Sequence, residues 1–126
     1  MTASLDLSPE KISQYRAAAI KRQKETEAEV GQRRQKAWQL ARQAAYLLRQ
    51  EFGVSRILVF GSLVREYGFT RWSDVDIAAW GISPTDTFRA IGAVMDLDDE
   101  IAINLVDVNT ARPTLLVTIE RDGIPV

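Results

Sequence analysis

The chain has 126 residues, a length that fits one domain with one modest core. It contains no cysteine and no histidine, which excludes disulfides, thiol nucleophiles, zinc sites built on thiolates or imidazoles, and triads with a histidine base. An enzyme with this composition must work with carboxylates, hydroxyls, cationic side chains, backbone amides and metal ions bound through oxygen. No stretch is long and apolar enough to span a bilayer, so we expect a cytoplasmic protein without a membrane partner.

The net charge of −1 conceals an asymmetry between the two parts of the chain. Residues 1–52 carry ten Lys and Arg against six Asp and Glu, a net of +4, and residues 53–126 carry six against eleven, a net of −5. An acidic half would repel phosphates, so metal ions are the natural mediators if it binds them. For the basic half we favour a solvated helix surface, and we expect no direct contact with nucleic acid.

The first third of the chain is predicted to be helical. Ser8, Pro9 and Glu10 form a typical helix start, and up to about Arg49 the sequence is rich in residues that favour helix. Gly31 leaves two alternatives open, either two helices or one long helix with a weak point.

Only the second part of this helical region has an apolar stripe. Apolar residues recur at helical spacing over residues 34–52, which predicts a face turned toward the core. Residues 11–30 have few of them. We therefore predict an N-terminal helical arm over residues 1–33 and a single domain over residues 34–126. The arm either packs on a partner or a second copy of the chain, giving a homo- or hetero-oligomer, or lies on the surface as a frayed helix.

The rest of the chain alternates strands with helices. This order predicts an α/β or α+β fold in which helices pack on a small mixed sheet. The predicted strands cover residues 56–60, 74–80 and 101–108, the predicted helices cover residues 83–95 and 111–122, a short turn or helix and a loop cover residues 63–72, and a terminal edge covers residues 124–126.

The first motif with chemical meaning is Gly61-Ser62, which directly follows the strand predicted at residues 56–60. A glycine lets the backbone approach a ligand, and a helix that starts here would add free N–H groups, its dipole and the Ser62 hydroxyl to an anion site. Taken alone, the pair is more typical of an ordinary turn.

The second motif is Asp74-Val75-Asp76. Strand alternation puts Asp74 and Asp76 on one face, roughly 7 Å apart, and Val75 on the other. Two adjacent like charges repel each other, and bound Mg²⁺ or Mn²⁺ would remove that cost while leaving coordination positions for phosphate and water. A hydrated strand edge is the alternative for this motif alone. Together, the two motifs predict a phosphate-binding bend beside a metal site, because the metal ions would bridge the carboxylates and the phosphates.

This combination resembles the Gly-Ser and Asp-x-Asp signature of polymerase-beta-like nucleotidyltransferases, most closely their smallest branch, the minimal nucleotidyltransferases (MNT). The likeness covers residues 34–126 and includes the run at 103–109. It implies that Gly61 and Ser62 hold the phosphates of ATP and that Asp74 and Asp76 bind Mg²⁺ or Mn²⁺. With Ser62, these two carboxylates are the predicted catalytic residues.

The resemblance also implies a partner. Many MNT proteins act as antitoxins beside a small helical HEPN ribonuclease toxin, and they can place AMP on a tyrosine hydroxyl of that toxin. We therefore expect a protein adenylyltransferase that neutralises a HEPN-family toxin. The alternative is a catalytically weak or inactive module that neutralises the toxin by covering it.

One departure from the family pattern supports that alternative. The family usually has a third carboxylate on the next strand, and the matching position here is Asn104, which is a poorer metal ligand and cannot act as a base. Asp107 is close in sequence, but alternation places it on the opposite face of the strand, where we expect it to cap the following turn.

Further nucleotide-binding candidates lie between or beside the motifs. They are Arg65, Arg71 and Ser73, with ordinary surface charge as the alternative for the two arginines. Trp72 and Trp80 are expected to pack at the rim. The acidic turn at residues 96–100 is expected to be simply solvated.

Overall fold

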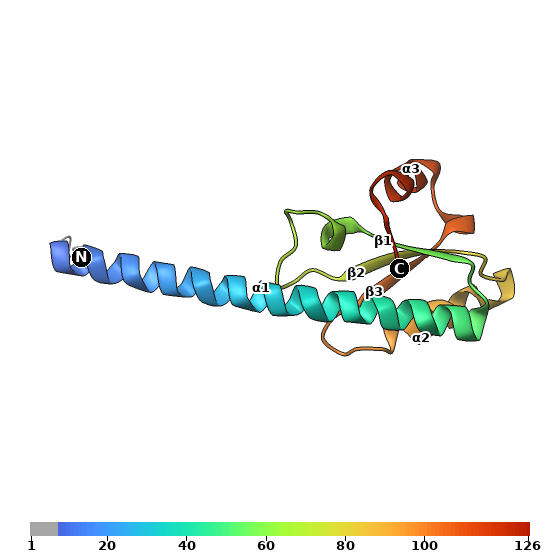
Figure 1. The fold of residues 1–126 in the computed structure, drawn as a ribbon, viewed down its shortest axis with the longest axis horizontal. Helices are drawn as coiled ribbons and strands as arrows, with labels where there is room; N and C mark the ends of the chain where they lie inside the picture. Colours follow the sequence, from blue (N-terminus) through green and yellow to red (C-terminus); the bar gives the residue numbers. More distant parts are fainter. Residues whose placement is uncertain (1–7) are drawn as a thin grey trace, which may run out of the picture.

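The computed structural model describes residues 8–126, so the first seven residues of the predicted arm lie outside the described part. Three helices and four short strands alternate along the described chain, with three short 3-10 turns between them (Figure 1). In chain order the elements are α1 Pro9–Phe52, β1 Arg56–Phe60, η1 Gly61–Val64, β2 Val75–Trp80, η2 Pro84–Asp86, α2 Thr87–Met95, β3 Ile103–Asp107, η3 Val108–Thr110, α3 Pro113–Asp122 and β4 Ile124–Pro125.

Helix α1 is a single helix of 44 residues that continues through Gly31, so of the two alternatives the single long helix is the one observed. It starts at Ser8, whose hydroxyl accepts a hydrogen bond from the Lys11 amide (3.3 Å). It ends at Gly53, which adopts the left-handed conformation (φ 63°) typical of a helix C-cap. Buried side chains begin only at Ala37. Contacts with the rest of the protein begin earlier, at Glu29 and Val30, and the part of the helix before them projects beyond the rest of the protein (Figure 1).

The four strands form one mixed sheet in the order β3-β2-β1-β4. β1 pairs antiparallel with both β2 and β4, and β2 pairs parallel with β3. The parallel pair is joined through α2, because a parallel connection needs a crossover. β2 is therefore a central strand with a partner on each side.

The two faces of the sheet are covered by different helices. α1 and α2 pack on one face, where they contact Val59, Ile77 and Ile103 in the main core. α3 covers part of the other face through Ile119, which packs on Leu58 and Ala78. The outer end of that second face is where Asp76 and Asn104 lie.

The predicted α/β class and element order agree with the structure. Both ends of each strand lie within two residues of the predicted limits. The helix predicted from residue 83 begins instead at Thr87, after the 3-10 turn η2. Within residues 8–126, no helix is long and apolar enough to cross a membrane.

Candidate functional site

The bend after β1 lies directly against a carboxylate of β2. Phe60 is the register partner of Asp76, so the chain leaves β1 beside this residue. Gly61 has φ 77°, and a Cβ built on it would lie 2.5 Å from Asp76 Oδ2. Only glycine combines this conformation with this close approach. The structure therefore brings the Gly-Ser bend and the Asp-x-Asp strand into one place.

Asp76 also faces the neighbouring strand. Its register partner on β3 is Asn104, whose side-chain Nδ2 donates a hydrogen bond to Asp76 Oδ1 (3.1 Å). The pKa of Asp76 is raised above the ordinary value of 3.8, chiefly because burial disfavours its charged form, and the charge of Asp74 adds to this. The Asn104 hydrogen bond and the charge of Arg65 act in the opposite direction.

Asp74 lies just before β2, at the same end of the sheet. Its side chain is 43% exposed and has one ion-pair contact, 3.9 Å from Arg33 of α1. With Asn104 it lines a pocket of about 220 Å³ whose remaining wall is the acidic turn before β3. Asp74 is therefore open to an incoming ligand, and its charge acts on Asp76, so the two carboxylates are within electrostatic reach of each other.

The chemistry of this donor set fits a hard divalent cation. Asp74 and Asp76 supply carboxylate oxygens, and the pKa of Asp76 is raised chiefly by burial, which disfavours an anion without a counter-charge. A cation would supply that counter-charge. Residues 8–126 contain no group of three or more His, Cys, Asp or Glu placed to hold a metal, so a third protein ligand would have to come from another residue type, such as Asn104, whose side-chain nitrogen contacts Asp76.

The segment expected to bind phosphates does not begin a regular helix at Gly61. η1 is a 3-10 turn of only four residues, so a helix dipole contributes little to anion binding. Backbone N–H groups, the Ser62 hydroxyl and Arg65 remain as donors. Arg65 lies beside the bend, where it lines a small hollow with Gly61, and its charge lowers the pKa of Asp76.

The other two nucleotide-binding candidates have partners outside this site. Arg71 lies 3.9 Å from Glu29 of α1 and stacks over the Trp72 ring (5.1 Å to its centroid). The Ser73 hydroxyl accepts a hydrogen bond from the Thr70 amide (2.8 Å) and so closes the turn before β2. The structure brings Gly61, Ser62, Arg65, Asp74, Asp76 and Asn104 together, but it does not add Arg71 or the Ser73 side chain to them.

The remaining acidic residues have structural contacts. Asp107 lies buried on the opposite face, where it accepts hydrogen bonds from Thr87 (2.8 Å) and the Asn109 amide (3.1 Å), so its predicted capping role is confirmed. The expectation of a merely solvated acidic turn is wrong for Asp98. It accepts bonds from two backbone amides of the turn and lies 3.3 Å from Lys36 of α1.

Two residues at the site were not predicted from the sequence. Arg33 Nε donates to the Ser73 carbonyl oxygen (2.9 Å), and Arg34 donates to the Leu63 carbonyl oxygen (2.9 Å). Both contacts join residues about 30 to 40 positions apart in the chain, and in a charged helix no local pattern distinguishes these arginines from their neighbours.

No protein-family model matches this sequence, and no curated protein sequence is similar to it. Solved structures are similar. In two variant crystal structures of the toxin–antitoxin complex MntA–HpeT, a chain matches 68% of this protein with TM-score 0.55 and 20% and 22% identity, over 70% and 69% of its own length.

Two further structures are similar. The complex of tri-AMPylated Shewanella oneidensis HEPN toxin with MNT antitoxin has a chain with TM-score 0.52 and 21% identity, over 71% of this protein and 70% of that chain. A protein from Sulfolobus solfataricus, named provisionally as a nucleotidyltransferase, has TM-score 0.52 and 15% identity, over 77% and 85%. The chain therefore has the fold of the minimal nucleotidyltransferases, the family that its two motifs resemble.

Proposed function

We propose that this protein transfers AMP from ATP to a tyrosine hydroxyl of a HEPN-family toxin and thereby neutralises the toxin. The observation that carries the proposal is the contact between the Gly61 bend and the Asp76 carboxylate across two paired strands. In this arrangement a triphosphate on the bend lies next to the carboxylates that would hold its cation. Nucleotidyl transfer needs this juxtaposition more than it needs a particular base.

The roles of the residues follow from their positions. The Ser62 hydroxyl, the backbone N–H groups of the bend and Arg65 bind the phosphates, and Asp74 and Asp76 hold Mg²⁺ or Mn²⁺ with the Asn104 amide as a further ligand. The cation supplies charge neutralisation at the phosphates. The partial burial of Asp76 strengthens its attraction for a cation, because the surrounding dielectric constant is lower than that of water.

The reaction is an in-line displacement. The acceptor hydroxyl oxygen forms a bond to the α-phosphorus of ATP, the bond to the β-phosphate oxygen breaks, and pyrophosphate leaves. The hydroxyl proton must go to a carboxylate or to solvent, because Asn104 cannot accept it. We expect slow transfer for this reason, with its rate set by how well the docked partner orients the hydroxyl.

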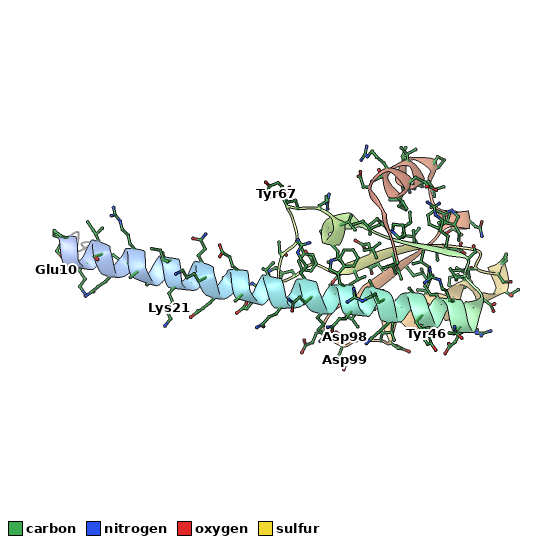
Figure 2. The ribbon with its side chains drawn as sticks, viewed as in Figure 1. Glu10, Lys21, Tyr46, Tyr67, Asp98 and Asp99 are labelled. Carbon is green, nitrogen blue, oxygen red and sulfur yellow. The ribbon has the colours of Figure 1, made fainter. Side chains whose placement is uncertain are left out.

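The comparisons support the choice of partner. Three similar structures are toxin–antitoxin complexes, and in one of them the toxin is a HEPN protein that carries three AMP groups. In another, two aspartates two positions apart are replaced by glutamate, a spacing equal to that of Asp74 and Asp76. The projecting part of α1, which carries Glu10 and Lys21 in Figure 2, offers a surface for such a partner.

A second function has a specific observation in its favour. Asn104 occupies the place of a third carboxylate and donates a hydrogen bond to Asp76, which leaves two carboxylates at the site. A chain with this site could neutralise a toxin by covering it, without transferring AMP. The two functions make opposite predictions about the mass of the partner.

The deciding experiment is co-expression with the HEPN-type product of the neighbouring open reading frame, followed by intact mass spectrometry of that partner. Added AMP units that disappear in the Asp74→Ala, Asp76→Ala double variant support transfer. A stable complex with a partner of unchanged mass supports occlusion and contradicts transfer. Transfer that survives in the double variant would show that these carboxylates are wrongly assigned. Absence of a HEPN gene beside this one would contradict the proposed partner.

A further inference from the structure

We propose that Arg33 of α1 is a positioning residue for Asp74, and that α1 thereby sets the geometry of the cation site. This inference rests on the proposed function, because it assigns Arg33 a role in preparing Asp74 to bind a cation. It concerns a residue outside both motifs, on a helix that contributes no predicted ligand.

Arg33 contacts the chain immediately before β2 at two points. Its Nε donates to the Ser73 carbonyl oxygen at 2.9 Å, and its Nη2 lies 3.9 Å from Asp74 Oδ1. Its side chain is only 18% exposed although it carries a full charge. A partly buried guanidinium has restricted geometry, because its planar donors must satisfy their acceptors together. The peptide unit that precedes Asp74 is therefore fixed by α1.

The next residue on α1 holds the other end of the same loop. Arg34 donates to the carbonyl oxygens of Leu63 (2.9 Å) and Arg65 (3.5 Å) and lies over the Phe69 ring (4.8 Å). The loop from η1 to β2 thus has both ends tied to consecutive residues of one helix, at the level where α1 leaves the domain (Figure 1). The middle of the loop, which carries the exposed Tyr67, extends away from α1 (Figure 2).

Two effects of Arg33 on a cation oppose each other. Its charge repels a cation at Asp74, whereas its hydrogen bond places the Asp74 backbone. The hydrogen bond is short, charge-assisted and partly buried, and the ion pair is long and joins a carboxylate that is 43% exposed to solvent. The positioning effect is therefore the larger one, and removing Arg33 should weaken cation binding.

The experiment measures Mn²⁺ binding to the purified chain by calorimetry, without nucleotide, and AMP transfer in parallel. Arg33→Met keeps the length of the side chain but removes the charge and the donors, and Arg33→Lys keeps the charge and one donor for the Ser73 carbonyl. Arg42→Met is the matched control, because Arg42 is exposed on α1 and has no hydrogen bond or ion pair within the described residues.

We expect the Mn²⁺ affinity of Arg33→Met to fall about tenfold, as for other residues that orient metal ligands, with a matching rise in the Mn²⁺ needed for half-maximal transfer. Arg33→Lys should recover most of the affinity, and Arg42→Met should match the wild type. If Arg33→Met also melts well below the wild type, Arg33→Lys decides: recovery of affinity supports positioning, and no recovery contradicts it.

Two results would overturn the inference while the proposed function stands. In both, the wild type binds Mn²⁺; in the first, Arg33→Met binds it with the same affinity as the wild type, and in the second, Arg33→Met binds it more tightly. Tighter binding would mean that the charge of Arg33 competes with the cation. If the wild type binds no Mn²⁺, the metal site of the proposed function fails, and this inference fails with it.

Discussion

The contact between Gly61 and Asp76 can be tested through stability alone. Gly61→Ala should cost two contributions. An L-residue in the left-handed region costs about 1–2 kcal/mol, and the new Cβ would lie 2.5 Å from Asp76 Oδ2, which must therefore move. Because Oδ2 can move only with the whole carboxylate, we expect the 3.1 Å hydrogen bond from Asn104 to Asp76 Oδ1 to be lost as well, a bond worth about 1.5 kcal/mol or more because the acceptor is charged.

Gly53→Ala is the matched control. Gly53 also has a positive φ (63°), but a Cβ there would meet nothing within 4 Å. This variant should lose only the conformational contribution, about 1–2 kcal/mol, so Gly61→Ala should be less stable than Gly53→Ala by about 1.5 kcal/mol. For a domain of this size the two melting temperatures should then differ by about 6 °C.

A double-mutant cycle isolates the contact with the carboxylate. In an Asp76→Ala background both close atoms, Oδ2 and Cγ, are absent, and only the Cβ at 3.4 Å remains. The cost of Gly61→Ala, measured by urea denaturation, should then fall to that of Gly53→Ala. If Gly61→Ala costs no more than Gly53→Ala, and the same with or without Asp76, then the bend and the carboxylate are not in contact. The proposed shared site would be refuted.

Three further predictions concern the charge, the ligands and the arm. Asp76→Asn should raise the melting temperature at pH 7. Because the native pKa of Asp76 is raised, the native state binds its proton more tightly, so Asp76 adds a downward slope to wild-type stability as pH rises from 3.8 through that native pKa, against the upward slope from Asp98, Glu120 and Asp122, whose pKa values are lowered. Urea titrations of Asp76→Asn over the same pH range should lack this downward slope. Asn104→Asp should tighten Mn²⁺ binding about tenfold in calorimetry and lower stability without metal, since it adds a third carboxylate; unchanged affinity would remove Asn104 from the ligand set. Deleting residues 1–28 should change the melting temperature of the domain by only about 2 °C, because none of the described residues 8–28 is buried, while the partner complex weakens in size-exclusion chromatography. A fully retained complex would exclude the arm as the docking surface.

Local patterns in the sequence predicted most of the fold. The strand at residues 56–60, the helix start at Ser8 and the α/β order all depend on short-range periodicity and caps, and the structure has them at or near the predicted positions. The continuity of α1 through Gly31 was left open. A single glycine costs a helix only about 1 kcal/mol, and the helix is anchored by core contacts on both sides of Gly31, from Val30 before it and from the buried residues that begin at Ala37.

The candidate site was predictable in part. The motifs named the bend and the two aspartates, and strand alternation placed Asp107 on the opposite, buried face. Strand pairing was needed to bring Gly61 against Asp76 and Asn104 onto Asp76. The motifs also suggested Arg71 and Ser73, whose side chains the structure directs to Glu29 and Thr70 instead.

By itself, the sequence determined which chemistry is open to this protein and which face of each element is apolar, because composition and periodicity are properties of residues close together in the chain. Only the tertiary structure decided that α1 holds both ends of the loop between the motifs, through Arg33 and Arg34. The physical reason is the range of the interactions. A guanidinium on α1 can bond to these carbonyl oxygens only once the sheet has formed, and the residues next to it in the sequence do not specify which carbonyl oxygens those will be.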